Sequence, residues 1–380
     1  MKVQTLVLAA SAALILSAQG VAQSDTGLER ALTELNAGLT APVGSASMAI
    51  SGDARIRNAY TVGGDKKAID TRARLNFDFN VNESVSASIG ASFYEDWDGA
   101  DMGSGDNNFN RYTVSASNLL GDGGSFTAGT QYFTLGSGRV IGSDDWDNAN
   151  QATSTGIWYD NAGFSLFFLE GDDGAGNDVD TFGLTFDYAL NVPGIGDINL
   201  LPYLLGGMVG EPGSTAFSTD IYGSEFSGSA MGMAWSGEYA TDGDTSAWTA
   251  STSIDIASLA SVPGVSSASL DLSFSSADEN WGAASGTGDN ADNALTWNQA
   301  GLNSGALWSF QDVSTAGVSF SPMEGWNGRL TRIDRDGNTA WNISASTTLG
   351  GAVDMWVGYD NTDGGVATDD TFWMTMSINF

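Results

Sequence analysis

The sequence contains no cysteine and no histidine among its 380 residues. Without cysteine, the chain has neither disulfides nor thiolate metal sites. Without histidine, it has no Ser-His-Asp triad, no histidine–zinc site and no imidazole that senses pH. Neither a phosphate-binding loop nor a nucleotide-binding fingerprint occurs, and no nucleophile stands beside an evident base. We therefore predict that the protein is not an enzyme and holds no cofactor.

Basic residues and proline are also scarce. The chain has 13 Lys and Arg against 46 Asp and Glu, a net charge of -33, and only 6 Pro. So acidic a chain is not expected to bind nucleic acid, which requires basic surface to neutralise phosphates. Glycine is abundant at 50 residues and aromatic residues make up 11%, while the mean hydropathy is -0.09. Glycine-rich turns with aromatic-rich strands favour a large antiparallel sheet.

Long hydrophobic runs are confined to the N-terminus. Residues 1–22 combine Lys2, an apolar stretch from Leu6 to Leu16, and small residues at Gly20 and Ala22. This pattern predicts a cleaved secretory signal peptide. The alternative, an uncleaved anchor, is disfavoured because a spanning helix needs about 20 apolar residues. Beyond the signal no such run follows, so we expect either a soluble exported protein or a membrane-inserted barrel.

One segment of the mature chain has helical periodicity. Within residues 23–50, an apolar face recurs over 24–39 at Leu28, Ala31, Leu32, Leu35 and Leu39. We predict a short amphipathic helix on the periplasmic side, which either shields part of the protein or contributes to trimer assembly.

From residue 51 onward the pattern has a period of two. Apolar and small or polar residues alternate over 85–93, 182–188, 270–274 and 353–359, in segments of about ten residues. A soluble sandwich alternates similarly, so the connections between strands carry more weight. They alternate between short turns, such as 82–84 and 322–325, and longer polar segments, such as 95–110, 135–153 and 277–311.

Short turns on one rim and long loops on the other are typical of outer-membrane barrels. We therefore predict that residues 51–380 form an all-β, transmembrane, antiparallel up-and-down barrel of about 18 strands. Sixteen strands is the alternative if one strand has been divided in error. Aromatic residues near strand ends predict girdles at the two membrane interfaces: Tyr60, Tyr94, Tyr112, Tyr132, Tyr159, Tyr188, Tyr203, Tyr239, Trp248, Trp341 and Tyr359.

The last strand carries the most specific local pattern. Phe372, Met374, Met376, Ile378 and the terminal Phe380 alternate with polar residues or tryptophan. This ending resembles the C-terminal recognition signal of bacterial outer-membrane proteins. With the strand pattern, it makes the chain similar to the Gram-negative porin superfamily, and we assign Met376, Ile378 and Phe380 to outer-membrane targeting.

This resemblance implies location in a Gram-negative outer membrane, contact with lipid and lipopolysaccharide, and insertion by the outer-membrane assembly machinery. It also implies a homotrimer and a third external loop folded into the lumen. The implied function is passive diffusion of ions and small hydrophilic solutes. Three alternatives remain open: a substrate-specific channel for sugars or uronate-like solutes, a secreted structural or adhesive β-protein, and a barrel enzyme.

The basic residues are gathered on two predicted strands. Arg55 and Arg57 share one face of the first strand, and Arg72 and Arg74 share one face of the second. A hairpin centred near Gly64 is expected to bring Arg57 opposite Arg72. By the same register, Arg55 lies opposite Arg74. A lipid-facing charge costs about 2–4 kcal/mol at mid-membrane depth, so this face is expected to line the lumen.

The four arginines resemble the arginine ladder of porin constrictions, and ordinary solvated lumen charges are the alternative. Whether Arg111, Arg329 and Arg332 extend this wall is left open. Residues 135–153 lie where the family folds its third loop inward, and carry Asp144, Asp145 and Asp147. An acidic loop against a basic wall would discriminate between ions; a solvated external loop is the alternative. Other acidic loops, around 172–180 and 360–370, offer oxygen ligands for calcium, although solvated carboxylates explain them equally.

Overall fold

A computed structural model describes residues 47–61, 67–96, 105–133, 135, 154–170, 179–193, 196–209, 217–230, 232–259, 265–278, 312–335, 338–363 and 370–380. The predicted signal peptide at 1–22 and the predicted helix at 24–39 lie outside these residues, as does most of the 277–311 connection. The first strand begins at Ser47, four residues before the barrel start at residue 51 that the sequence predicts.

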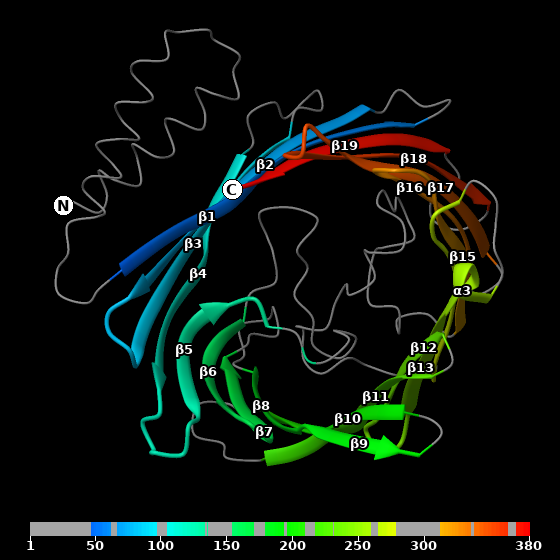
Figure 1. The fold of residues 1–380 in the computed structure, drawn as a ribbon. Coiled ribbons are helices and arrows are strands. Elements are labelled where there is room, and N and C mark those ends of the chain that lie inside the picture. The colour runs from blue at the N-terminus through cyan, green and yellow to red at the C-terminus, as the bar shows by residue number, and fades with distance from the viewer. Residues whose placement is uncertain are drawn as a thin grey trace, which may run out of the picture.

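The described residues are almost all in antiparallel strands, which follow one another around a ring in chain order (Figure 1). The strands are β1 (Ser47–Thr61), β2 (Lys67–Asn80), β3 (Val85–Asp96), β4 (Gly105–Ser117), β5 (Ser125–Gln131), β6 (Ser154–Asn161), β7 (Phe164–Glu170), β8 (Val179–Phe186), β9 (Tyr188–Val192), β10 (Gly196–Val209), β11 (Phe217–Ala230), β12 (Met233–Thr241), β13 (Ser246–Asp255), β14 (Ala268–Ala277), β15 (Asp312–Met323), β16 (Trp326–Arg335), β17 (Asn338–Leu349), β18 (Val353–Asp363) and β19 (Thr371–Asn379).

The ring is a closed barrel of 18 strands. β8 and β9 are two parts of one strand, separated at Asp187, because both pair with β10. The ring closes where β19 pairs with β1, in a register that places Asn379 opposite Asp53 and Thr375 opposite Arg57. The predicted count of 18 is therefore confirmed, and the alternative of 16 is wrong. The architecture is an up-and-down antiparallel barrel without free edges.

The connections alternate in length as the sequence predicts. On the rim where the chain begins and ends, β6 and β7 are joined by two residues, 162–163, and β15 and β16 by 324–325. One such connection contains an unpredicted short helix, α3 (Ile256–Leu259). On the opposite rim the connections between β5 and β6 (132–153) and between β14 and β15 (278–311) are much longer, but β16 and β17 are joined by only two residues, since Arg335 pairs with Asn338. In the described part of the chain, no helix is long and apolar enough to cross a membrane.

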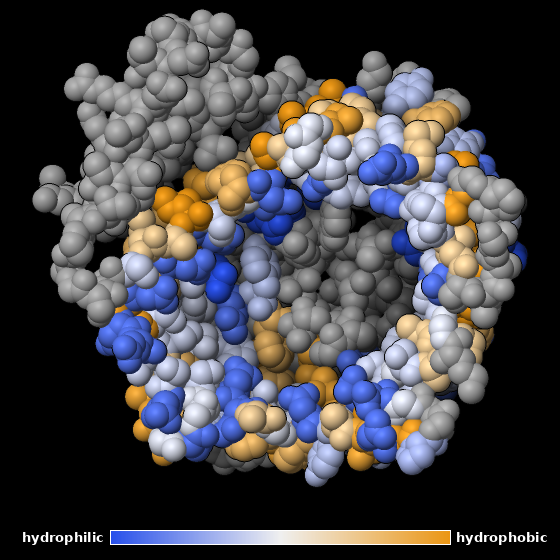
Figure 2. All heavy atoms as spheres, viewed as in Figure 1, coloured by the Kyte–Doolittle hydropathy of each residue, from blue (hydrophilic) through white to orange (hydrophobic). Residues whose placement is uncertain are grey.

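The outer face of the barrel carries most of the exposed apolar side chains. In β1, Ile56 is 54% exposed, whereas its neighbour Arg55, on the other face, is 2% exposed. Figure 2 shows hydrophobic residues mainly around the outer contour and hydrophilic residues around the opening. Six of the predicted girdle residues are exposed on this outer face: Tyr60, Tyr112, Tyr188, Tyr239, Trp248 and Trp341. The prediction is wrong for Tyr203, which points inward and is buried, because it stands one residue out of phase with the exposed Leu204.

Part of the inner wall is apolar, which the sequence pattern did not predict. Buried side chains from β6 to β14, together with Leu135 of the connection that precedes β6, form one cluster: Leu135, Trp158, Phe167, Leu169, Tyr203, Leu205, Ile221, Ala240, Ala247 and Ala277. The register confirms that they share the inner face, since Leu205 pairs with Ile221 and Ala240 with Ala247. The inner wall is therefore not uniformly hydrophilic.

Many strand glycines lie directly opposite aromatic residues on the neighbouring strand. Such pairs on the inner face are Gly183 with Phe167, Gly223 with Tyr203 and Gly358 with Trp373. A Cβ atom at any of these glycines would collide with the aromatic ring. The ring thus covers the backbone that glycine leaves bare, a cross-strand arrangement that stabilises glycine in strands. These pairs give much of the high glycine content a structural role.

The turn between β4 and β5 is held by one carboxylate. Asp122 accepts hydrogen bonds from the Tyr159 hydroxyl, from Asn161 Nδ2 at 3.2 Å and from the backbone N–H of Gly124 at 3.0 Å. Because these bonds favour the ionised form, the Tyr159 hydroxyl first and the Gly124 N–H second, the pKa of Asp122 lies below its ordinary value. The carboxylate therefore ties the turn to the neighbouring hairpin of β6 and β7.

We expect the Asp122 carboxylate to make barrel stability depend on acid. Its pKa is lower in the folded state than the ordinary value of about 3.9 in the unfolded state. The stabilisation of the folded barrel by the Asp122 carboxylate is therefore complete above about pH 4, and it is lost as pH falls through the folded-state pKa. In the Tyr159→Phe variant, the pKa of Asp122 should rise toward its ordinary value. Urea unfolding of the refolded barrel between pH 6 and pH 3 should then show a weaker acid dependence than the unmodified protein; an unchanged dependence would contradict this role.

Candidate functional site: the charged wall of the lumen

The paired strands β1 and β2 position the arginines on the inner face. Arg55 lies opposite Arg72, and Arg74 lies opposite Asp53. The predicted pairing of Arg57 with Arg72 and of Arg55 with Arg74 is therefore wrong by two residues. Turn geometry sets hairpin register, and the pattern of the strands alone does not define the turn. Because side chains alternate with a period of two, a two-residue shift preserves the predicted face but changes every partner.

The corrected register gives the arginine cluster a carboxylate at its centre. Arg72 Nη2 lies 3.2 Å from Asp53 Oδ1, and Arg74 Nε donates to Asp53 Oδ2. The side chains of Asp53, Arg72 and Arg74 are 11%, 6% and 20% exposed, respectively. In so shielded a position, charges interact more strongly than in water. Asp53 therefore offsets part of the repulsion among the four arginines and fixes two of them against the wall.

Sequence reasoning overlooked Asp53, although the signal was present. Asp53, Arg55 and Arg57 are spaced two apart, so any reading that placed the arginines inward also placed the aspartate inward. The first strand is therefore not purely basic on its inner face, contrary to the sequence-based prediction. Arg57 lies opposite Asp70 in the register, which adds a second acidic position beside the cluster.

The three arginines that were candidates to extend this wall, Arg111, Arg329 and Arg332, do not lie together. The register places Arg111 on the inner face, opposite Gly90. Arg329 also faces the lumen, where it lines a pocket. Arg332 lies on the outer face, where its Nη2 is 3.2 Å from Asp334 Oδ2 and its guanidinium is 6.0 Å from the centre of the Trp341 ring. Arg332 is therefore not part of the basic wall.

The predicted acidic loop is only partly described. Asp144, Asp145 and Asp147 lie outside the described residues, but the chain leading to them is visible directly after β5. The Phe133 ring lies 4.6 Å from that of Phe167 and 5.9 Å from that of Trp158, centre to centre, and Leu135 is buried. Since Phe167 and Trp158 belong to the inner wall, the chain enters this connection along the inside of the barrel.

Carboxylates also occur on the inner wall opposite the arginines. Glu225 of β11 lies beside Glu238 of β12, and these strands face β1 and β2 across the ring (Figure 1). The hydroxyl of Tyr203 donates to Glu238 Oε1 at 2.7 Å. Farther round, Asn342 donates to Asp360 within the wall formed by β17 and β18. Glu225 and Glu238 were not predicted from the sequence, where each is an isolated acidic residue in an alternating strand. Asp360, which the sequence placed in the acidic loop around 360–370, lies instead in β18 and is buried.

The described residues contain no cluster of three acidic side chains that could hold a metal ion. The loop containing Asp172, Asp173 and Asp178 lies outside them, so the suggestion of loop-bound calcium stays a prediction. What the geometry offers is a charged inner wall. It can discriminate solutes by charge and by hydrogen bonding.

Comparison with known proteins finds similarity of shape alone. No protein-family model matches it, and no curated protein does. Similar solved structures include a triple mutant of Rhodopseudomonas blastica porin, with a TM-score of 0.47 and 14% identity over 88% of this chain and 100% of that one. A double mutant of Rh. blastica porin gives a TM-score of 0.48 and 13% identity over the same shares. At this level of similarity, the fold assignment rests on the strands and their register.

Proposed function

We propose that the protein is an outer-membrane channel for passive diffusion of ions and small hydrophilic solutes. The observation that carries this proposal is the placement of Arg55, Arg72, Arg74 and Asp53 on the inner face of a closed barrel whose outer face is apolar. A dry core would not accommodate such a cluster, because burying charge without water is costly. A water-filled lumen accommodates it and lets it act on passing ions.

The apolar outer face with its exposed tyrosines and tryptophans argues for contact with lipid rather than for a secreted adhesive protein. In this proposal the protein is a channel and not an enzyme, resides in the outer membrane of a Gram-negative bacterium and assembles as a homotrimer.

A folded barrel should migrate faster on a detergent gel before boiling than after it, and cross-linking of the envelope fraction should yield a trimer. A migration unchanged by boiling would argue against the barrel in the membrane.

We expect the channel to prefer cations moderately. The external loops are rich in aspartate, and a negative mouth concentrates cations. This effect should weaken between 0.1 M and 1 M salt, where the Debye length falls from about 10 Å to about 3 Å. The measurement is the reversal potential in a planar bilayer under a salt gradient. Clear anion selectivity in the unmodified protein would mean that the arginines control the constriction.

Two sets of substitutions test the opposing charges. Replacing Arg72 and Arg74 with alanine should increase the cation preference, because Asp53 then loses both of its positive partners. Neutralising Asp144, Asp145 and Asp147 should decrease it if the acidic loop lies beside the arginines. Arg332→Gln removes the same charge from the outer face and should leave the reversal potential unchanged, so it serves as the control.

A further inference from the structure

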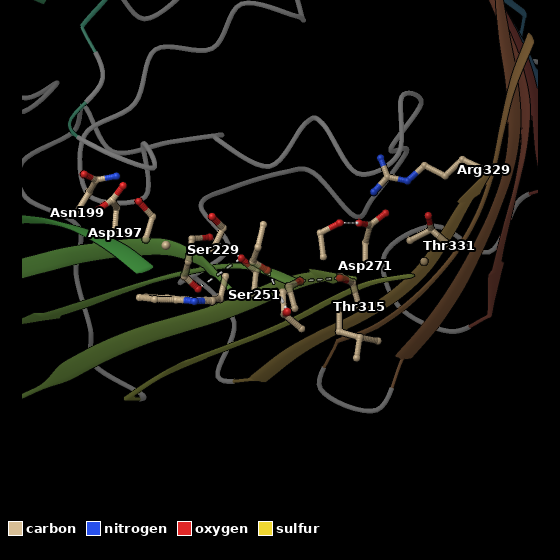
Figure 3. A pocket seen from close by; sticks show the side chains of 18 residues that line it. Asp197, Asn199, Ser229, Ser251, Asp271, Thr315, Arg329 and Thr331 are labelled. Carbon is tan, nitrogen blue, oxygen red and sulfur yellow. Dashed lines mark hydrogen bonds between the residues drawn. The ribbon is translucent and has the colours of Figure 1, made fainter. Parts of the chain in front are cut away.

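A pocket of about 660 Å³ lies on the inner wall across β10 to β16, away from the arginine cluster (Figure 3). Most of the polar side chains that line it are serines and threonines. Carboxylates occur at Asp197 and Asp271, and the single positive charge of the lining is Arg329. The pocket therefore combines many neutral hydrogen-bonding groups with one cation.

The hydroxyl groups form short pairs along the wall. Ser236 and Ser251 are joined at 2.6 Å, and Ser273 and Thr315 also at 2.6 Å; in each pair either oxygen can be the donor. A hydroxyl group donates one hydrogen bond and accepts two, and it rotates to suit its partner. Such a surface can exchange its internal hydrogen bonds for bonds to a hydroxylated solute without leaving a polar group unsatisfied.

The two charged groups near Thr331 differ in how well they are satisfied. Asp271 accepts hydrogen bonds from Ser253 at 2.6 Å, from Ser319 at 3.1 Å and from Ser269 at 3.4 Å. Arg329, by contrast, forms no ion pair within the described part of the chain. Its Nε is shielded from solvent and has no hydrogen-bond partner. An anion, or another hydrogen-bond acceptor, would therefore complete the contacts of Arg329.

The side chain of Arg329 is placed to meet a solute in the lumen. In Figure 3 it extends from β16 away from the sheet, on the side of Asp271. A carboxylate that meets the end of a guanidinium makes two parallel hydrogen bonds, to Nη1 and Nη2. This approach does not require access to the shielded Nε. Arg72 and Arg74 are less suited to this role, because each already forms an ion pair with Asp53.

We propose that this wall is a binding subsite for a small solute that carries both a carboxylate and several hydroxyl groups, as a sugar acid does. The inference rests on the proposed channel function and specifies a solute class for it. The carboxylate binds Arg329, while the hydroxyl groups of the solute bind Asp271 and the serine and threonine side chains beside it. Neutral sugars share the second set of contacts and lack the first.

The test is binding of glucuronate and glucose to the full-length refolded barrel in detergent, measured by calorimetry at constant ionic strength. These probes share the ring and most hydroxyl groups and differ in the carboxylate. We expect glucuronate to bind about tenfold more tightly than glucose, the value of one charge-assisted contact. Arg329→Gln should reduce glucuronate affinity to the level of glucose and leave glucose binding unchanged. Arg329→Lys, which keeps the charge but loses the fork, should be intermediate.

The matched control is Arg332→Gln, which removes a guanidinium from the same strand but from the outer face. It should leave both affinities unchanged. Equal binding of the two sugars by the unmodified protein would overturn the inference, and so would a glucuronate preference that survives Arg329→Gln. Because binding is measured without current flow, these outcomes are separate from a failure of the proposed function, which would appear as absence of conductance in the planar bilayer.

Discussion

Replacing Phe380 with aspartate, or deleting it, is expected to deplete the folded protein from the outer membrane. The terminal residue closes the barrel: its N–H donates to the Gly52 carbonyl at 3.0 Å, and the Gly52 N–H donates to its carbonyl at 2.9 Å. Its ring lies against Gly52, where a Cβ atom would collide with it. Deletion removes both hydrogen bonds, at about 1 kcal/mol each, and the contact of a half-buried ring, at about 1 kcal/mol more.

The measurement is the amount of heat-modifiable protein in the outer-membrane fraction, together with the urea midpoint of the refolded barrel. Phe380→Tyr keeps an aromatic ring and the backbone bonds, so it should retain nearly normal levels. The aspartate variant should refold in detergent with its backbone bonds intact, yet should fail to accumulate in cells if Phe380, with Ile378 and Met376, forms the recognition signal. Normal membrane levels of Phe380→Asp would contradict that role.

Asp53→Asn is expected to produce the second large effect, on both stability and selectivity. Asparagine matches the shape of aspartate but leaves Arg72 and Arg74 without their shared carboxylate. Removing one partner of a buried ion pair lowers the free energy of unfolding by about 3 kcal/mol. Because these side chains are partly exposed to the lumen, we expect a loss of about 2 kcal/mol. The added net positive charge beside the pore should shift the reversal potential toward anions.

The control is Asp334→Asn, which removes a carboxylate from an ion pair on the outer face. In that pair the side chains of Arg332 and Asp334 are 48% and 34% exposed, respectively. Its loss should therefore lower the free energy of unfolding by less than about 1 kcal/mol. It should also leave the reversal potential unchanged. Urea unfolding and bilayer recordings of both variants decide the matter. If the two substitutions have equal effects, Asp53 does not organise the arginine cluster.

The features that the sequence predicted well are those set by local alternation. Successive residues of a strand point to opposite faces, so the inward position of Arg55 and the outward position of Ile56 can be predicted from the neighbouring residues of the same strand. The count of 18 strands follows in the same way, from the turns between alternating segments. The C-terminal strand was predicted because its alternation runs to the last residue, and β19 confirms its extent.

The features that were missed depend on contacts between strands. The pairing of Arg74 with Asp53 depends on a hairpin register that turn geometry sets to within one residue. Tyr203 looked like an interfacial residue because tyrosine is common there; its inward position follows from its phase relative to Leu204. The acidic wall at Glu225 and Glu238 arises from two strands that are side by side in space but carry one glutamate each in the sequence.

The order of the strands has a consequence for how the barrel forms. Every pairing joins consecutive segments of the chain except that of β19 with β1. Hairpins of consecutive strands form with little loss of chain entropy, whereas the last pairing must bring together the two ends of the whole sheet. The entropy of loop closure rises only as the logarithm of length, by about 0.6 kcal/mol for each doubling. Among the strand pairings of the described residues, that of β1 with β19 therefore has the largest sequence separation, and we infer that it forms last, when a curled sheet already holds its two edges close together.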